Sequence, residues 1–259
     1  MNGASGLWIK RIVITLAALL VWELLYRVGL LNPLIFGAPS LMWSAAVKDG
    51  RAFVVAFQFT AYEIVAACAI AWFGGVAFGV IAGATAVRGR IFAPMLSAVI
   101  AVPLVVLYPI AIAWLGIGSG SKIAYGAVAG FCPVALATLY GIRTIDMRLA
   151  EMARAMGASR GQILAQVMTR LALPAIVSGL RIGTSLVIIS VVQGEMLTST
   201  DGLGFLISYH RALFNVGHVY LGILLVVLMA AAAHVALSAL ERHFGRWREL
   251  QQATEAGAA

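Results

Sequence analysis

Four ionisable side chains lie inside long apolar stretches of this sequence: Glu23, Glu63, Arg181 and Glu195. A charge at the centre of a bilayer costs about 2.5–3.5 kcal/mol, so each is a candidate for a pathway or a helix pair. Along a helix that begins near residue 174, Arg181 lies about 10 Å in and can reach the cytoplasmic face. Glu195 lies about 31 Å along the same helix, near the outer surface, where it needs no partner in lipid. Glu23 is nearest to mid-membrane and could pair with another chain or simply face the helix bundle.

The sequence contains no set of residues that is typical of an enzyme active site. The sequence contains no GxxxxGK[ST] phosphate loop, no Ser/His/Asp arrangement and no metal-ligand spacing. Four histidines are scattered, and Cys68 and Cys132 stand singly in apolar runs, which favours packing roles. We therefore predict no catalytic residue, no metal and no cofactor bound by this chain.

The composition indicates lipid as the surrounding medium. Apolar residues make up 62% of the 259 residues and charged residues 11%, against about 45–50% and about 25% in soluble domains. The net charge of +8 comes from Lys and Arg between apolar stretches, so membrane topology explains it better than nucleic acid binding. The apolar runs lack period-2 alternation, so the predicted fold is all-α, a polytopic membrane helix bundle.

Six apolar segments have the roughly 20 residues that a helix needs to cross a bilayer. The first has no obvious cleavage site, so we expect an uncleaved span. Twelve Lys and Arg residues fall in connections on one side and five on the other, including Lys122, which places both termini in the cytoplasm. The predicted spans are Ile12–Leu31, Phe53–Ala86, Phe92–Ile117, Ile123–Ile142, Pro174–Met196 and Val219–Leu240.

Proline and glycine inside the predicted spans indicate kinks and close contacts. Pro103 and Pro109 each remove a backbone donor, so the third span should kink there, and a kinked helix can line a pathway. Gly75, Gly79 and Gly83 form small-xxx-small pairs that allow another helix to approach closely.

One connection, residues 142–173, is too polar to cross the bilayer and yet is clearly patterned. Asp146 can cap a short helix, and Gly157 can end it. Within this helix, four residues at helical spacing predict one apolar face. They are Leu149, Met152, Ala153 and Met156.

A second helix should start at Ser159, which forms a capping-box pattern with Gln162. Ile163, Val167 and Leu171 predict its apolar face at i, i+4 and i+8. The pattern leaves two readings open: an amphipathic hairpin on the inner leaflet, or an element that docks into a groove of a cytoplasmic partner. The exposed side would carry Arg154, Arg160 and Arg170.

The triplet Glu151-Met152-Ala153, followed by Gly157 and by Leu173-Pro174, resembles the EAA…G loop of bacterial ABC importer permeases. The segments GASRGQI, LPAIVSGLRIG, GLGFLI and YPIAIAWLGIGSGSKI are similar to the nitrate/sulfonate/taurine branch of the type I, binding-protein-dependent class. The resemblance runs from about Pro39 to Leu240. Three departures are Met152 in place of the usual alanine, Thr169-Arg170 in place of a common Leu-Pro pair, and Glu63 where arginine is frequent.

The resemblance implies a permease subunit of an ABC importer in the bacterial inner membrane. It would work as a homodimer with two cytoplasmic ATPase subunits, which bind ATP-Mg, and with a periplasmic substrate-binding protein. The solute would be a small anion such as nitrate, a sulfonate or a taurine-like compound, moved by alternating access. The implied ATPase-docking residues are Glu151, Met152, Ala153, Arg154, Gly157, Ala158 and Ser159, with Leu173 and Pro174 as the hinge to the next span.

Two other functions remain open from the residues alone. One is a secondary transporter driven by an ion gradient through an intramembrane carboxylate such as Glu23; the other is a structural or signalling membrane subunit. No convincing repeat between the halves supports the secondary transporter. We expect one permease domain over 1–259, with the first span and outer connection in 1–52, the core in 53–240 and a cytoplasmic tail in 241–259.

Overall fold

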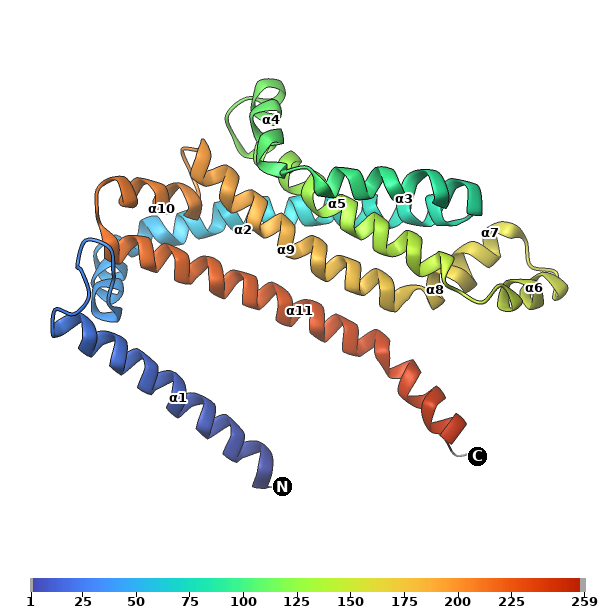
Figure 1. Ribbon diagram of the computed structural model, residues 1–259, viewed down its shortest axis with the longest axis horizontal. Coiled ribbons are helices and arrows are strands. Elements are labelled where there is room, and N and C mark those ends of the chain that lie inside the picture. Colours follow the sequence, from blue (N-terminus) through green and yellow to red (C-terminus); the bar gives the residue numbers. More distant parts are fainter. Residues whose placement is uncertain (1, 257–259) are drawn as a thin grey trace. The chain divides into compact units, whose positions relative to one another are not determined.

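The computed structural model describes the backbone of residues 2–256 and the side chains of residues 10–239. Every regular element in this part of the chain is helical, as predicted (Figure 1). In chain order these are α1 (Asn2–Arg27), α2 (Pro39–Gly83), α3 (Ala86–Ala101), η1 (Leu104–Leu107), α4 (Tyr108–Leu115), α5 (Ser119–Arg143), α6 (Met147–Ala155), α7 (Arg160–Gln162), η2 (Ile163–Met168), α8 (Thr169–Leu171), α9 (Leu173–Leu197), α10 (Leu203–Ala212) and α11 (Val216–Ala256).

Among the described residues, four helices are long and apolar enough to cross a membrane. These are α2, α5, α9 and the Val216–Ala239 part of α11, and the pair α3 and α4 counts as a fifth if it forms one broken span. The first predicted span lies on α1, which is helical but is not among these four. Six spans therefore stay a prediction. The basic side chains of the tail predicted over 241–259 lie outside the described side chains.

Residue contacts divide the chain into two compact units. Unit 1 comprises Met1–Phe59 and Glu195–Val227, and unit 2 comprises Thr60–Gly194 and Leu228–Ala259. In unit 1, α2 starts well before the predicted Phe53, and its backbone leaves helical geometry at Asp49, with φ −122° and ψ 21°. This part of α2 is therefore two helical segments joined by a kink.

In unit 2, α2 packs closely against α5 through the predicted glycines. A Cβ at Gly79 would lie 2.5 Å from Thr138 Cβ and 2.6 Å from the carbonyl oxygen of Ala135. Gly75 and Gly83 face α5 in the same way, four residues before and after, so one face of α2 is in near backbone contact with α5. The predicted close contact of small residues is thus confirmed.

The third predicted span is broken rather than gently kinked. Helix α3 ends at Ala101, and the next residue, Val102, has extended backbone and is followed by Pro103. The axes of α3 and of the stretch Leu104–Leu115 differ by 89°. Pro109 lies in the first turn of α4, where no intrahelical N–H bond is lost. The kink predicted at Pro109 is therefore wrong, because that proline starts a helix instead of interrupting one.

Candidate functional site

The polar connection forms a helical hook between α5 and α9 in unit 2 (Figure 1). Asp146 caps α6 as predicted, because its side chain accepts a hydrogen bond of 2.9 Å from the N–H of Arg148. Gly157 adopts φ +86° directly after the helix, and its N–H bonds to the carbonyl of Arg154 at 2.9 Å. A left-handed residue after a helix end is the usual role of glycine, so the chain reverses here at little cost.

The second helix of the hook begins with the predicted capping box. The N–H of Ser159 donates to Gln162 Oε1 at 2.8 Å, and the N–H of Gln162 donates to Ser159 Oγ at 3.3 Å. The backbone then widens into the π-helix η2, where the N–H of Thr169 reaches back five residues to the carbonyl of Leu164. The predicted apolar spacing at i, i+4 and i+8 is therefore wrong, because Ile163 and Met168, five residues apart, are the buried pair.

The underside of the hook is anchored in one hydrophobic cluster. Ala150 of α6 and both buried residues of η2 belong to it, together with residues at the adjoining ends of α5 and α9. Each of the six buried members has little or no solvent exposure, so the hook is fixed to both helices at once. These members are Ile142, Ala150, Ile163, Met168, Ala172 and Ile176.

The large apolar residues of α6, and Met156 directly after its last residue, are exposed rather than buried in this cluster. Met156 is 88% exposed and Met152 is 64% exposed, and Leu149 is also exposed. The predicted apolar face is largely exposed: the small Ala150 lies against the cluster, and of the four predicted residues only Ala153 is partly buried there. Exposed flexible methionines on an anchored helix form an adaptable contact surface. We call Met152 and Met156 the methionine face.

The other predicted docking residues surround the methionine face. Glu151 and Arg154 are exposed and make no ion pair with another described residue. Ala158 is half-buried against the cluster, and Ser159 is exposed but occupied in the capping box. At the exit of the hook, Leu173 is the first residue of α9 and Pro174 is the second, where its missing N–H costs no helical bond.

The predicted intramembrane residues are placed in helix-pairing contacts. Arg181 of α9 donates a hydrogen bond of 3.2 Å from Nη2 to Ser238 Oγ of α11, within unit 2. In unit 1, Glu23 Oε1 lies 2.7 Å from Arg27 Nε, and its Oε2 accepts a 3.1 Å bond from the N–H of Ser40, at the start of α2. Glu23, on which the secondary-transporter alternative relied, therefore already holds partners in its own chain.

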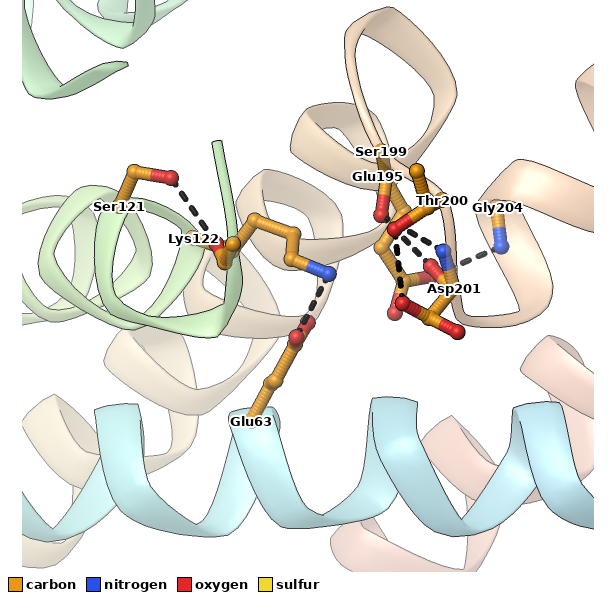
Figure 2. A network of polar contacts seen from close by, with 9 residues as sticks. Glu63, Ser121, Lys122, Glu195, Ser199, Thr200, Asp201 and Gly204 are labelled. Atoms are coloured by element: carbon orange, nitrogen blue, oxygen red, sulfur yellow. Dashed lines mark hydrogen bonds and ion pairs between the residues drawn. The ribbon is translucent and has the colours of Figure 1, made fainter. Parts of the chain in front are cut away.

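A buried ion pair joins α2 to α5 in unit 2 (Figure 2). Lys122 Nζ lies 2.6 Å from Glu63 Oε1, and the side chains are 2% and 0% exposed. The second carboxylate oxygen of Glu63 has no hydrogen-bond partner among the described residues. This pair was not predicted from the sequence, because Lys122 was assigned to an outer connection. In the structure α5 starts three residues before Lys122, at Ser119.

Glu195, in unit 1, holds the turn between α9 and α10 (Figure 2). Its Oε2 accepts a 2.8 Å bond from the N–H of Gly204, in the first turn of α10. Gly202 adopts φ +101°, and any Cβ there would collide with the Glu195 carboxylate. The prediction that Glu195 needs no partner near the outer surface is therefore wrong: Glu195 is buried, and its carboxylate accepts a hydrogen bond from an N–H at a helix start.

A histidine cluster lies in unit 1 near the kink of α2. His218 Nε2 is 2.8 Å from Asp49 Oδ2, and the His210 ring stacks on the His218 ring with centroids 4.3 Å apart. Burial lowers the pKa of His210, the neighbouring His218 lowers it further, and Asp49 opposes both effects. No group of three side chains that could hold a metal occurs among the described residues.

Comparison with known proteins identifies relatives that are similar to this chain in sequence. Residues 75–249 match the family described as binding-protein-dependent transport system inner membrane component. The chain is 31% identical to the taurine transport system permease protein TauC of Escherichia coli, over 90% of this chain and 88% of TauC. It is also 37% identical to the riboflavin transport system permease protein RibX of Chloroflexus aurantiacus, over 60% of this chain and 58% of RibX.

The fold is similar to that of a solved transporter. A chain of the MetNI methionine ABC transporter in an inward facing conformation superposes with a TM-score of 0.66 at 20% identity, over 80% of this chain and 99% of that chain. At that identity the likeness concerns the fold alone. Because the family match covers more than half of the chain, the protein belongs to the binding-protein-dependent inner membrane components, the permease subunits of ABC importers, which are transporters and not enzymes.

Proposed function

We propose that this permease receives its energy through the methionine face of α6, which docks into a groove of a separate cytoplasmic ATPase. The observation that carries the proposal is the exposure of Met152 in α6 and of Met156 directly after it, 64% and 88%, whereas Ala150 on the opposite side of the helix is buried. Glu151 and Arg154 flank the face with exposed charges, which would fix the orientation of the partner.

The assembly that fits this docking site is a permease homodimer with two ATPase subunits and a periplasmic binding protein. The chain would cross the inner membrane six times, with α1 as the first span and both termini in the cytoplasm. When the ATPase subunits close on ATP-Mg, they would push the hook and shift the permease between outward and inward states. Gly157 at the end of α6, with Leu173 and Pro174 at the start of α9, would act as the points where the hook turns.

The proposed solute is a small organic or inorganic anion, such as a sulfonate, nitrate or a taurine-like compound. Support comes from the similarity to TauC, which extends over 90% of this chain. A separate binding protein would supply most of the selectivity, so the permease would need only a moderately selective path.

The test replaces both residues of the methionine face by glutamine, which has similar length and similar helix propensity. In Met152→Gln/Met156→Gln, we expect the tagged permease to co-purify at least about tenfold less cognate ATPase, because two buried contacts each contribute about 1 kcal/mol or more. ATP-driven uptake into proteoliposomes should fall in parallel. Leu171→Gln is the matched control, since Leu171 is an exposed apolar residue of α8 in the same hook.

Two outcomes separate docking from the alternative in which the hook lies on lipid. Glu151→Lys should weaken ATPase binding if a protein groove receives α6, whereas added positive charge should favour contact with anionic lipid. Full ATPase binding and full uptake in both the glutamine and the lysine variants would defeat the docking assignment.

A further inference from the structure

Unit 1 contains an open cavity of about 510 Å³ that belongs neither to the hook nor to the buried ion pair of unit 2. It lies between the stretch 48–59 of α2 and the turn that joins α9 to α10. Phe59 and Phe205 contribute aromatic surface to its wall, and Val55 contributes aliphatic surface. The wall is thus largely apolar, with charged groups at a few places.

Two cations line the cavity. Lys48 and Arg51 are three residues apart on α2, so their side chains project from neighbouring positions on the helix. Both side chains are exposed, and neither makes an ion pair or hydrogen bond with another described residue. A guanidinium beside an ammonium suits a carboxylate, a sulfonate or another oxyanion.

Two carboxylates line the same cavity, and each has one oxygen occupied. Asp49 Oδ2 lies 2.8 Å from His218 Nε2, and Asp201 Oδ2 accepts a 2.8 Å bond from Thr200 Oγ1. Their Oδ1 atoms have no partner among the described residues, so they can accept from an ammonium group. A simple anion would meet these two negative charges, whereas a molecule with both charges satisfies both sets of groups.

The membrane side of the cavity follows from the proposed topology. With both termini in the cytoplasm and six spans, the connection that follows the fifth span lies on the periplasmic side. Thr200, Asp201 and Gly202 of this connection line the cavity. In this topology the cavity opens on the side from which an imported solute arrives.

On the basis of the proposed function, we infer that this cavity is an entry subsite for the transported solute, and that the solute class it takes is a small zwitterion. The anionic group binds Lys48 and Arg51, and the ammonium binds the open oxygens of Asp49 and Asp201. The short carbon chain between them lies against the apolar wall. The proposed solute class, a small anion, is thereby narrowed to small molecules that carry a positive charge as well as a negative one.

The test measures protection of an engineered cysteine in the purified permease–ATPase complex without ATP or binding protein. Ala52→Cys is suitable because Ala52 lines the cavity and is exposed, while the native Cys68 and Cys132 are buried. Taurine, used as the zwitterionic probe, should slow labelling by neutral N-ethylmaleimide. Ethanesulfonate and ethylamine, which carry one charge each, should need about fivefold higher concentrations or more for the same protection, because each lacks one ion pair.

Two controls make the result specific. Leu213→Cys, which is exposed in unit 1 and does not line the cavity, should be labelled at the same rate with and without taurine. Arg51→Gln in the Ala52→Cys background should raise the half-protecting taurine concentration about fivefold. Arg211→Gln removes an exposed cation that does not line the cavity, and it should leave that concentration unchanged.

The subsite is refuted if taurine does not protect Ala52→Cys, protects Leu213→Cys equally, or protects as well after Arg51→Gln. If ethanesulfonate by itself protects Ala52→Cys at the same concentration as taurine, the assignment of the solute as a zwitterion is refuted. Labelling requires neither ATP hydrolysis nor a functional methionine face. Failure of ATPase docking with taurine protection intact would therefore count against the proposed function only, and normal ATP-driven uptake without protection would count against the subsite only.

Discussion

The contact between α2 and α5 gives a matched pair of glycine substitutions in one helix. A Cβ at Gly79 would lie 2.5 Å from Thr138 Cβ and 2.6 Å from the carbonyl oxygen of Ala135, while a Cβ at Gly74 would lie 3.5 Å from the Phe131 ring. Ordinary van der Waals contact begins at 3.4 Å. Gly79→Ala therefore forces two helix backbones apart, whereas Gly74→Ala fits the existing space.

The magnitude follows from two opposing effects. Alanine favours a helix by about 1 kcal/mol over glycine, and this gain applies to both variants. Overpacking costs about 1–3 kcal/mol, and Gly79→Ala should lie near the upper end because a carbonyl cannot rotate away as a side chain can. We expect Gly79→Ala to be about 2 kcal/mol less stable than wild type and Gly74→Ala about 1 kcal/mol more stable or unchanged.

The assay is thermal unfolding followed by a thiol-reactive fluorophore, which labels the buried Cys68 and Cys132 as the helices separate. At roughly 2–4 °C per kcal/mol for a chain of this size, the two variants should differ by about 4–12 °C. Uptake should fall with Gly79→Ala, since α5 carries the hook at its end. The reasoning fails if Gly79→Ala unfolds at or above the temperature of Gly74→Ala.

Two further predictions concern charge. Lys122→Met deprives the buried Glu63 carboxylate of its cation, which typically costs about 3–5 kcal/mol, and the double variant Lys122→Met/Glu63→Met should recover most of that stability in the same assay. A double variant no more stable than the single one would contradict the pairing. Burial lowers the pKa of His210 in the folded protein, so below about pH 6.5 the unfolded chain binds more protons than the folded chain. The free energy of unfolding should therefore rise as pH rises through this range and fall as pH falls. His210→Gln should flatten this dependence in thermal unfolding followed by tryptophan fluorescence, and an unchanged slope would assign the effect to another group.

Local chemistry made the hook predictable from the sequence. Asp146 as a cap, Gly157 as a helix end and the Ser159–Gln162 capping box each depend on residues no more than three positions apart, and the structure contains all three features. The four helices long and apolar enough to cross a membrane were predictable for the same reason, because an apolar run of sufficient length is a local property. The break at Pro103 was indicated, although its 89° angle was not.

Features set by tertiary contact were not predictable. Apolar periodicity indicated one face through Met152 and Met156 but not the residue that anchors α6, which is the small Ala150 packed against α5 and α9. The pairing of Glu63 with Lys122 joins residues from separate helices, and the sequence offered only two isolated charges. For Lys122 the sequence did contain one indication: this residue follows a Ser-Gly-Ser run that starts a helix, which places Lys122 inside the helix.

The packing of α5 against α9 decides how a push on the hook would act on the rest of unit 2. A Cβ at Gly141 would lie 2.6 Å from Ala175 Cβ, and a Cβ at Gly183 would lie 2.6 Å from Val134 Cγ2 and 2.9 Å from the carbonyl oxygen of Gly130. The two helices are therefore in near backbone contact at both levels, and densely packed surfaces of this kind resist sliding or bending. The hook is covalently joined to both helices and shares one buried cluster with them. If the ATPase pushes the hook as proposed, we therefore expect α5 and α9 to move together as a rigid pair.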